Sequence, residues 1–469
     1  MVKTFGCQMN EHDSERLAGL LVAEGMEPAS GVDDADVIVF NTCCIRENAD
    51  NKLYGQLGQL KALAARRPGL QIAVGGCLAQ KDRDALRERA PHVDVVFGTH
   101  NLARAPALLR HAAANGPVVE VVDAPGTDGA AGAGAGSGAA PAPPAAPAVR
   151  DVAHAAWVTI QTGCDNSCAF CIVPAVRGPE VSRPFDEIVG DVRALARRGV
   201  VEVTLLGQNV NSYGRDLTRR RPLFADLLRA VGAVDGVRRV RFTSPHPKDL
   251  RPDTIAAMAE TPAVCEQLHL PLQSGSNRVL AAMRRGYTAE RYLARLGAAR
   301  DAVGDLAVTT DIIVGFPGET EDDFCETLAV VAEAAYDSAY TFIFSPRPGT
   351  RAAALEDRYV EPEVVAERFE RLRAVVERSA LRRHEARVGR IEEVLVEGPS
   401  KRDPSVLTGR TRQGKLVHFA PGAAGDAPAP GAFCDVRVDA AAPHHLRGTL
   451  TRVASQPAPL PRRIPVAAR

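Results

Sequence analysis

The order of apolar and polar positions divides the first third of the chain into alternating strands and helices. Three short apolar runs, at residues 2–5, 36–40 and 71–74, have the length and composition of buried strands. Apolar residues recur at helical spacing over residues 15–23 and 46–64, between these runs. The alternation predicts an α/β domain with a parallel sheet. A misassigned start codon or a natural truncation would explain why the first run is so short.

Each of these three predicted strands runs into a cysteine, at Cys7, Cys43 and Cys77. The carboxyl ends of parallel strands lie along one edge of a sheet, where ligands of doubly wound folds bind. We therefore expect the three thiols, called here the N-terminal triad, to converge in one crevice. A cysteine at a strand end can also be a small buried residue. Cys44 has no counterpart after the other strands and is interpreted as packing.

The middle third repeats the strand-then-helix pattern about six times. The predicted strands are residues 155–160, 201–206, 238–243, 266–270, 307–314 and 339–344. Such repeats predict a partial or full (β/α) barrel, in which chemistry gathers at the carboxyl ends of the strands. Polar or turn-forming segments follow four of these strands, at residues 207–211, 244–247, 271–275 and 315–320. We expect them to share one rim, although His246 and His269 are more often hydrogen-bonded residues than ligands.

The last part of the chain changes to short alternating strands after a charged helix at residues 362–387. Alternation over residues 391–397, 416–419 and 434–438, separated by Gly and Pro, predicts a small antiparallel barrel. Between residues 382 and 452 there are 12 Lys or Arg against 8 Asp or Glu. This surplus makes the domain the best candidate for RNA backbone contacts, with Arg410 and Arg412 as the closest guanidinium pair.

Composition limits the remaining possibilities. At 469 residues the chain is too long for one ordinary core. Its 57 basic and 57 acidic residues balance, so any affinity for nucleic acid must come from a local patch. Neither a basic leader with an apolar core nor a run of eighteen apolar residues occurs, which predicts a cytoplasmic protein without membrane contact. Residues 124–149 are almost entirely Ala, Gly and Pro and predict a flexible linker.

The densest chemical signal is a C-x3-C-x2-C loop just after the first predicted barrel strand. Its cysteines, called here the loop triad, are Cys164, Cys168 and Cys171. A 4Fe-4S cluster usually takes four thiolates, so three ligands would leave one iron open. The spacing does not match a zinc site, which pairs two sets of ligands. Cysteines outside any cluster are expected to be core thiols, namely Cys265, Cys325 and Cys434.

Several longer motifs carry a resemblance to a known family. Phe170 beside Cys171 is the aromatic residue that radical S-adenosylmethionine (SAM) enzymes carry in this loop. Other matching segments are Phe5-Gly6-Cys7-Gln8-Met9-Asn10, Asn41-Thr42-Cys43 with Arg46-Glu47-Asn48-Ala49, Gly75-Gly76-Cys77-Leu78-Ala79-Gln80, and Leu205-Leu206-Gly207-Gln208-Asn209-Val210-Asn211. Over nearly its whole length the sequence resembles the radical-SAM methylthiotransferases, and among them those that act on N(6)-dimethylallyladenosine in tRNA.

The resemblance implies a domain division. The N-terminal methylthiotransferase domain would span residues 1–115, and the linker residues 116–152. The radical-SAM core would span residues 153–382, the RNA-binding TRAM domain residues 383–453 and a tail residues 454–469. The linker is longer than expected for the family.

The resemblance also implies two 4Fe-4S clusters. The loop triad would hold the cluster whose open iron binds SAM and cleaves it to a 5′-deoxyadenosyl radical, and the N-terminal triad would hold an auxiliary cluster that carries sulfur. Gln208, Asn209 and Glu180 are expected to contact SAM because of their place near the rim. A methylthio group would be added to carbon 2 of the modified adenosine next to the anticodon, reached in a loop where bases can be splayed out.

The expected partners are the tRNA anticodon loop, an electron donor such as flavodoxin or ferredoxin, and a sulfur donor. Two alternatives remain open from the sequence. One is a methylthiotransferase that acts on threonylcarbamoyl-adenosine or on an aspartate of a ribosomal protein. The other is a non-catalytic iron-sulfur protein that binds RNA.

Overall fold

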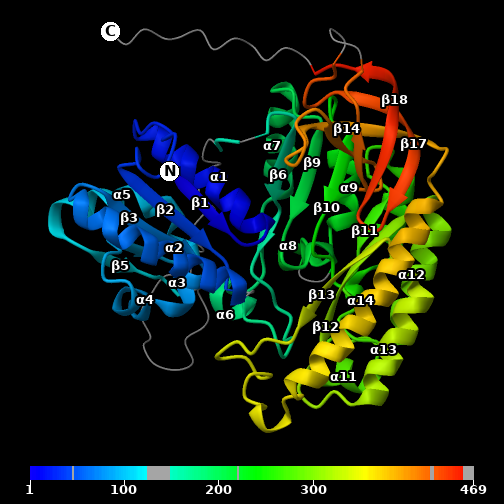
Figure 1. The fold of residues 1–469 in the computed structure, drawn as a ribbon, viewed down its shortest axis with the longest axis horizontal. Helices are drawn as coiled ribbons and strands as arrows, with labels where there is room; N and C mark the ends of the chain where they lie inside the picture. The colour runs from blue at the N-terminus through cyan, green and yellow to red at the C-terminus, as the bar shows by residue number, and fades with distance from the viewer. Residues whose placement is uncertain (45–46, 124–147, 151, 219–220, 423–426, 458–469) are drawn as a thin grey trace.

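The computed structural model describes residues 1–469 except 45–46, 124–147, 151, 219–220, 423–426 and 458–469. Most of the predicted Ala/Gly/Pro linker therefore lies outside the described residues. The chain forms an α/β domain, a parallel-stranded barrel and a small β-barrel in sequence order (Figure 1). In the part of the chain that the structure describes, every helix is too short or too polar to cross a membrane.

The N-terminal domain is built on one parallel sheet whose strands follow the chain order β1-β2-β3-β4-β5. The strands are β1 (Val2–Phe5), β2 (Val37–Thr42), β3 (Gln71–Gly76), β4 (Val95–Phe97) and β5 (Val118–Glu120). The three strands predicted from the apolar runs are confirmed. Because all neighbouring pairs are parallel, the carboxyl ends of β1, β2 and β3 lie side by side.

Helices cover both faces of this sheet, so its central strands are buried on two sides. They are α1 (Gln8–Ala23), α2 (Glu47–Arg66), α3 (Cys77–Asp82), α4 (Asp84–Arg89), the 3-10 helix η1 (Thr99–Arg104) and α5 (Ala105–Asn115). Val39 packs with α1 and α5, whereas its neighbours Ile38 and Phe40 pack with α2 and α3. The first helix begins at Gln8, directly after Cys7, and not near residue 15 as the apolar spacing indicated.

The six predicted strands of the middle domain are confirmed. They are β6 (Ala155–Thr159), β9 (Glu202–Leu206), β10 (Arg239–Phe242), β11 (Gln267–His269), β12 (Ala307–Val314) and β13 (Ser338–Ile343). They form two parallel sheets, β10-β9-β6 and β11-β12-β13, which a single backbone bridge from Val240 to Val264 connects. Among the described residues β6 and β13 are not paired with each other, so the barrel is partial.

Shorter elements connect these strands, and the larger helices cover the outside of the barrel. They are β7 (Gln161–Thr162), α6 (Val173–Arg177), β8 (Val181–Ser182), α7 (Phe185–Arg197), η2 (Val210–Ser212), α8 (Arg215–Thr218), α9 (Phe224–Gly232), η3 (Pro247–Asp249), α10 (Pro252–Glu260), α11 (Asn277–Ala282), α12 (Ala289–Ala302), α13 (Glu321–Ala334), η4 (Glu356–Arg358) and α14 (Pro362–Glu385). Thr320 caps α13 through the expected capping box with Asp323. Cys265 is buried as predicted, but Cys325 is exposed. Phe324 is among the α13 residues that face the core, and the next helical position, Cys325, points away from it.

The C-terminal domain is a closed barrel with strand order β14-β15-β16-β18-β17. The strands are β14 (Ile391–Pro399), β15 (Leu407–Thr411), β16 (Leu416–Phe419), β17 (Phe433–Ala442) and β18 (His445–Ser455). Alternate residues such as Val394, Val436 and Phe419 fill its core, together with Cys434, whose predicted burial is confirmed. The predicted small antiparallel barrel is therefore present, with one parallel pair between β16 and β18.

Buried charged residues attach the C-terminal barrel to the amino ends of the middle strands. Arg239, which begins β10, is fully buried and donates to the carbonyls of Arg410 (2.8 Å) and Glu393 (3.0 Å). Lys415 forms a buried 2.6 Å ion pair with Asp337, just before β13. Removing one partner of a buried ion pair typically costs about 3–5 kcal/mol, so this contact holds the two domains in one arrangement.

The same interface corrects the predicted RNA contact at Arg412. Its guanidinium donates to the Glu266 carboxylate (2.8 Å) and to the carbonyl of Val264 (2.9 Å), both in the middle domain. Arg410 is half-exposed and pairs with Glu397 at 2.8 Å. Arg412 therefore attaches the C-terminal barrel to the middle domain, whereas Arg410 stays on the surface of the C-terminal barrel.

Candidate functional site

The loop triad lines one cavity of about 570 Å³ at the carboxyl end of the barrel. Cys164, Cys168 and Cys171 all contribute to its wall, and residues 348–351 also line it. The loop lies directly after β7, and α6 follows it. The structure therefore brings together the three thiols that the C-x3-C-x2-C spacing predicted.

Backbone contacts hold the cysteine loop in place. The amide of Cys164 donates to Gly178 O (3.1 Å), and the amide of Ala169 donates to Met283 O (3.0 Å). Gly163 has a φ of 75°, and a Cβ at this position would collide with the carbonyl of Pro179. A glycine is needed here because only it accepts this conformation without strain and allows the approach.

Two polar side chains contact the sulfur atoms of this loop. Arg285 is almost fully buried, and its Nη1 donates to Cys168 Sγ at 3.3 Å. Asn166 Nδ2 donates to Cys164 Sγ at the same distance. Burial raises the pKa of Cys164 and raises that of Cys171 to about 12, because a desolvated thiolate is unfavourable. A metal that binds thiolates would remove that penalty.

The barrel rim carries hydrogen-bond acceptors that have no partner within the described residues. These buried atoms are Gln161 Oε1, Gln208 Oε1, Asn209 Oδ1 and Gln273 Oε1. Buried polar atoms are normally paired, so orphaned ones at the ends of strands indicate a missing ligand. SAM has the chemistry that fits, because its amino, ribose hydroxyl and adenine amino groups are donors.

Glu180, the third residue predicted to contact SAM, lies beside these acceptors. Its carboxylate accepts a 2.6 Å hydrogen bond from Ser212 Oγ, and Ser212 Oγ also lies 2.7 Å from Asn209 O. Burial raises the pKa of Glu180 to about 7. His246 is a hydrogen-bonded loop residue, as the sequence favoured, since its ring accepts from the Lys248 amide at 3.2 Å.

The N-terminal triad lies where β1, β2 and β3 end, and two buried asparagines hold these ends together. Asn10 Nδ2 donates to Asn41 Oδ1 (3.2 Å), and Asn41 Nδ2 donates back to Asn10 O (2.8 Å). Asn10 Oδ1 also accepts from Cys7 Sγ at 3.3 Å. Gly76, directly before Cys77, has a φ of 94°, and a Cβ there would meet Asn41. The matched motifs therefore position cysteines through glycines and amides.

Neighbouring thiols and one cation favour the thiolate form of two cysteines of the N-terminal triad, Cys7 and Cys77. A hydrogen bond with the Cys43 thiol and, to a smaller extent, the positive charge of Arg177 lower the pKa of Cys7 to about 6. The Cys44 thiol, again with Arg177, lowers the pKa of Cys77 to about 7. Cys44 is fully buried, as its interpretation as a packing residue requires, and it also adds a fourth sulfur at this site.

Neither set of thiols is arranged around a single ion. In the described ranges, no three His, Cys, Asp or Glu side chains are placed to hold one metal ion. This does not conflict with an iron-sulfur cluster, because each thiolate of such a cluster binds a different iron. Both sets consist only of sulfur, which is the donor set that 4Fe-4S clusters use.

Sequence reasoning missed two residues that the fold brings to these sites, and a third on the exposed face of the barrel sheet. Arg285 and Arg177 contact the two triads from distant segments, and no local pattern marks them. Tyr340 is 56% exposed on β13 opposite Asp311 of β12, so both side chains lie on the same face of the sheet. That face is turned away from the core, because the alternate residues of β12 are the buried ones. The alternation of apolar residues along β12 was the one sequence signal that could have identified this exposed face.

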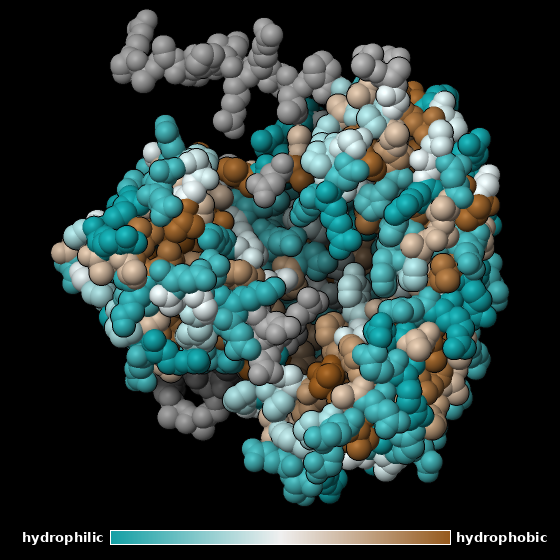
Figure 2. All heavy atoms as spheres, viewed as in Figure 1, coloured by the Kyte–Doolittle hydropathy of each residue, from teal (hydrophilic) through white to brown (hydrophobic). Residues whose placement is uncertain are grey.

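His269 joins Tyr340 on this face of the barrel. Its Nε2 lies 3.4 Å from Asp311 Oδ2, its Nδ1 lies 2.9 Å from Thr309 Oγ1, and its ring packs edge-on against Tyr340. The imidazole is hydrogen-bonded through Nδ1, as the sequence favoured. Figure 2 shows that the molecule is hollowed between the N-terminal domain and the barrel.

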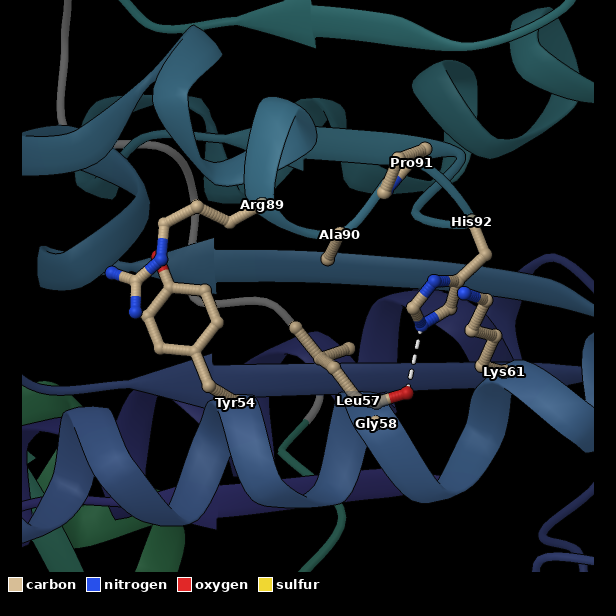
Figure 3. A pocket seen from close by; sticks show the side chains of 8 residues that line it. All are labelled: Tyr54, Leu57, Gly58, Lys61, Arg89, Ala90, Pro91 and His92. Carbon is tan, nitrogen blue, oxygen red and sulfur yellow. Dashed lines mark hydrogen bonds between the residues drawn. The ribbon is translucent and has the colours of Figure 1, made fainter.

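Another hollow, of about 520 Å³, lies between α2 and the end of α4 (Figure 3). Arg89 stacks on the Tyr54 ring at 3.7 Å, and His92 Nε2 lies 2.8 Å from the Leu57 carbonyl. The hollow contains no cysteine and none of the residues predicted to bind SAM. It is not part of the candidate site.

Comparisons with protein families find three matches along the chain. Residues 158–331 match the Radical SAM superfamily, residues 385–451 match the TRAM domain, and residues 1–98 match the Uncharacterized protein family UPF0004. A cysteine loop of this spacing on a partial (β/α) barrel, with that match, defines a radical SAM protein. The superfamily implies a 4Fe-4S cluster and SAM as cofactors.

Curated relatives narrow this class. The chain is 52% identical to the tRNA-2-methylthio-N(6)-dimethylallyladenosine synthase of Mycobacteroides abscessus over 95% of the chain and 87% of the relative. It is 53% identical to the protein of that name from Mycolicibacterium vanbaalenii, covering 95% of the chain and 86% of the relative. The chain therefore belongs to the tRNA-2-methylthio-N(6)-dimethylallyladenosine synthase family.

Solved structures support the fold alone. The radical S-adenosylmethionine methyltransferase TsrM from Kitasatospora setae, with tryptophan substrate and a SAM analogue bound, matches with a TM-score of 0.52 and 13% identity. The match covers 73% of this chain and 72% of that chain.

Proposed function

We propose that this protein adds a methylthio group to carbon 2 of N(6)-dimethylallyladenosine, next to the anticodon of tRNA. The observation that carries the proposal is the identity of 52–53% over 95% of the chain to synthases named for this product. This similarity favours the dimethylallyl substrate over threonylcarbamoyl-adenosine or a ribosomal-protein aspartate. The unpaired acceptors on the barrel rim, which SAM could satisfy, favour an enzyme over a non-catalytic RNA-binding protein.

The loop triad would hold the radical-SAM cluster, and Arg285 donates a hydrogen bond to the sulfur of Cys168 in this triad. When bound, this cluster and SAM supply an electron and a carbon radical that can remove hydrogen from an unreactive ring carbon. Gln208, Asn209 and Glu180 would hold SAM through the unpaired amide oxygens and the carboxylate on the barrel rim. Their task is to bind and orient the cofactor.

A second 4Fe-4S cluster in the N-terminal triad is part of the proposal. Converting C–H to C–S–CH₃ needs a sulfur atom as well as a methyl group, and the loop triad alone provides no sulfur carrier. When bound, the second cluster would carry that sulfur on its open iron. The sulfur-only donor set and the pKa values of Cys7 and Cys77, lowered towards neutrality, support thiolate ligation here.

The adenine ring would stack on Tyr340, because its exposed ring and the neighbouring His269 form an aromatic wall on the face of the barrel turned away from the core. The RNA backbone would contact the outer face of the C-terminal barrel. There Arg447 lies opposite His418 across β16 and β18, Arg402 is exposed nearby, and the rings of His418 and His445 are 5.2 Å apart. These groups replace Arg412 as the expected phosphate contacts.

The reaction also requires an external electron donor, such as a flavodoxin or a ferredoxin, and a sulfur source. We place it in the cytoplasm because its proposed substrate is tRNA. Mass spectrometry of tRNA nucleosides from a strain that lacks the gene tests the function. We expect N(6)-dimethylallyladenosine to accumulate without its methylthio group, and the intact gene to restore it. Unchanged methylthio-adenosine in the deletion strain would rule the proposal out.

A further inference from the structure

Helix α6 belongs in sequence to the cysteine loop of the barrel but packs into the core of the N-terminal domain. Ile172 and Val176 are buried in the same apolar cluster as Cys77 and Leu78. The carbonyl of Val176 accepts a 2.7 Å hydrogen bond from Thr99 Oγ1, and α6 packs against α3 and η1. In Figure 1, α6 lies between the two domains. The segment after Cys171 therefore connects the two sets of cysteines directly.

Arg177 ends this helix and extends into the N-terminal domain. Its side chain is 7% exposed, and its Nη2 lies 3.0 Å from Asp13 Oδ2 on α1. Helix α1 starts directly after Cys7, and Cys77 is the first residue of α3. The guanidinium therefore lies between α1 and α3, the helices that follow Cys7 and begin at Cys77, and it interacts with both of these thiols.

A buried arginine between domains could also be a purely structural contact. Ion pairs of this kind stabilise weakly, because desolvation offsets their Coulomb attraction. An apolar residue would fill the same space between α3 and α1. The position of the cation beside two thiols from different strands has another physical use: a cluster bound by thiolates is negatively charged, and burial of such a charge is costly unless a cation is near.

We propose that Arg177 is a positioning residue for the N-terminal cluster, supplied by the radical-SAM domain. It compensates the negative charge of the thiolates and fixes their place relative to the loop triad through α6. Asp13 orients the guanidinium. The inference rests on the proposed second cluster and adds the residue that ties it to the first.

The test compares Arg177→Gln, which removes the charge, with Arg177→Lys, which keeps it. A matched control is Arg368→Gln, because Arg368 is equally buried and paired with Glu319 at 3.0 Å but contacts no cysteine of either triad. Each protein is purified anaerobically as the full chain. Iron per chain is counted, and the midpoint potential of each cluster is measured by redox titration followed by electron paramagnetic resonance.

Reduction adds negative charge to a cluster, so loss of a nearby cation disfavours it. We expect Arg177→Gln to shift the potential of the second cluster to a more negative value or to lose its iron, from about eight to about four atoms per chain. Arg177→Lys should stay near the parent, and Arg368→Gln should leave both potentials unchanged. The inference is overturned if Arg177→Gln matches the parent, if Arg177→Lys behaves like Arg177→Gln, or if Arg368→Gln gives the same shift. A parent chain with only four irons would instead refute the proposed second cluster itself.

Discussion

The two sets of cysteines are assembled by opposite routes. The loop triad comes from one short segment that backbone hydrogen bonds and Gly163 hold in place, and it opens into a cavity. The N-terminal triad comes from three strand ends far apart in sequence, and it is assembled only when the parallel sheet forms. A local loop can be identified from spacing alone, whereas a site at a sheet edge requires the fold.

Their electrostatic surroundings differ as well. Burial raises the pKa of Cys164 and Cys171, so these thiols resist ionisation until a metal binds. Neighbouring thiols and Arg177 lower the pKa of Cys7 and Cys77. Cys7 and Cys77 are therefore closer to the thiolate form, whereas burial keeps Cys164 and Cys171 in the thiol form.

The largest expected effect separates the two roles. Cys168→Ala should abolish both SAM cleavage and methylthiolation, because it removes a ligand of the radical-generating cluster. Cys7→Ala should retain SAM cleavage but lose sulfur insertion. Anaerobic assays with dithionite, which measure 5′-deoxyadenosine and the modified nucleoside separately, check this. Equal losses in the two variants would show that the sites are not separable as proposed.

Metal content gives the next comparison. The anaerobically purified chain should contain about eight irons, and replacement of the whole N-terminal triad by alanine should leave about four. The radical-SAM cluster should keep its spectrum in that variant. Colorimetric iron and sulfide analysis measures both values. A count of about four irons in the parent chain would show that the second cluster is absent.

A smaller effect is expected at the aromatic wall that Tyr340 and His269 form. Tyr340→Ala should raise the KM for RNA about 10-fold, since stacking of a base on an aromatic ring contributes about 1–3 kcal/mol. Tyr340→Phe keeps the ring and should behave like the parent. Steady-state kinetics with an anticodon stem-loop checks this. If both variants have the KM of the parent, the adenine does not stack there.

The smallest expected effect is a pH dependence of the contact between the domains. Burial lowers the pKa of His12 to about 4, and its Nδ1 lies 2.8 Å from Thr159 Oγ1 of the barrel. The unfolded chain protonates near its ordinary value of about 6.5, so this residue's contribution is complete above that pH and is lost progressively down to about 4. His12→Gln should reduce the fall in thermal stability between pH 7.5 and 5. An unchanged fall would assign the effect to other groups.

Most of the fold could be predicted because strand and helix periodicities are local. The apolar runs predicted the six barrel strands and the first three strands of the N-terminal sheet. The start of α1 was missed, because Gln8 to Ser14 are mostly polar and the apolar spacing marks only the buried face. Cys325 was misplaced because a lone cysteine carries no periodicity of its own.

The sequence by itself determined the chemistry: three thiols in one loop, three more after parallel strands, and motifs specific enough to indicate a family. Only the tertiary structure decided which charges serve that chemistry. Arg177 and Arg285 reach the thiols from distant segments, while Arg412 turns from the expected RNA surface into an interface with Glu266. The physical reason is that cysteine spacing is a local constraint on the backbone, whereas the partner of a long cationic side chain depends on which surfaces folding brings together.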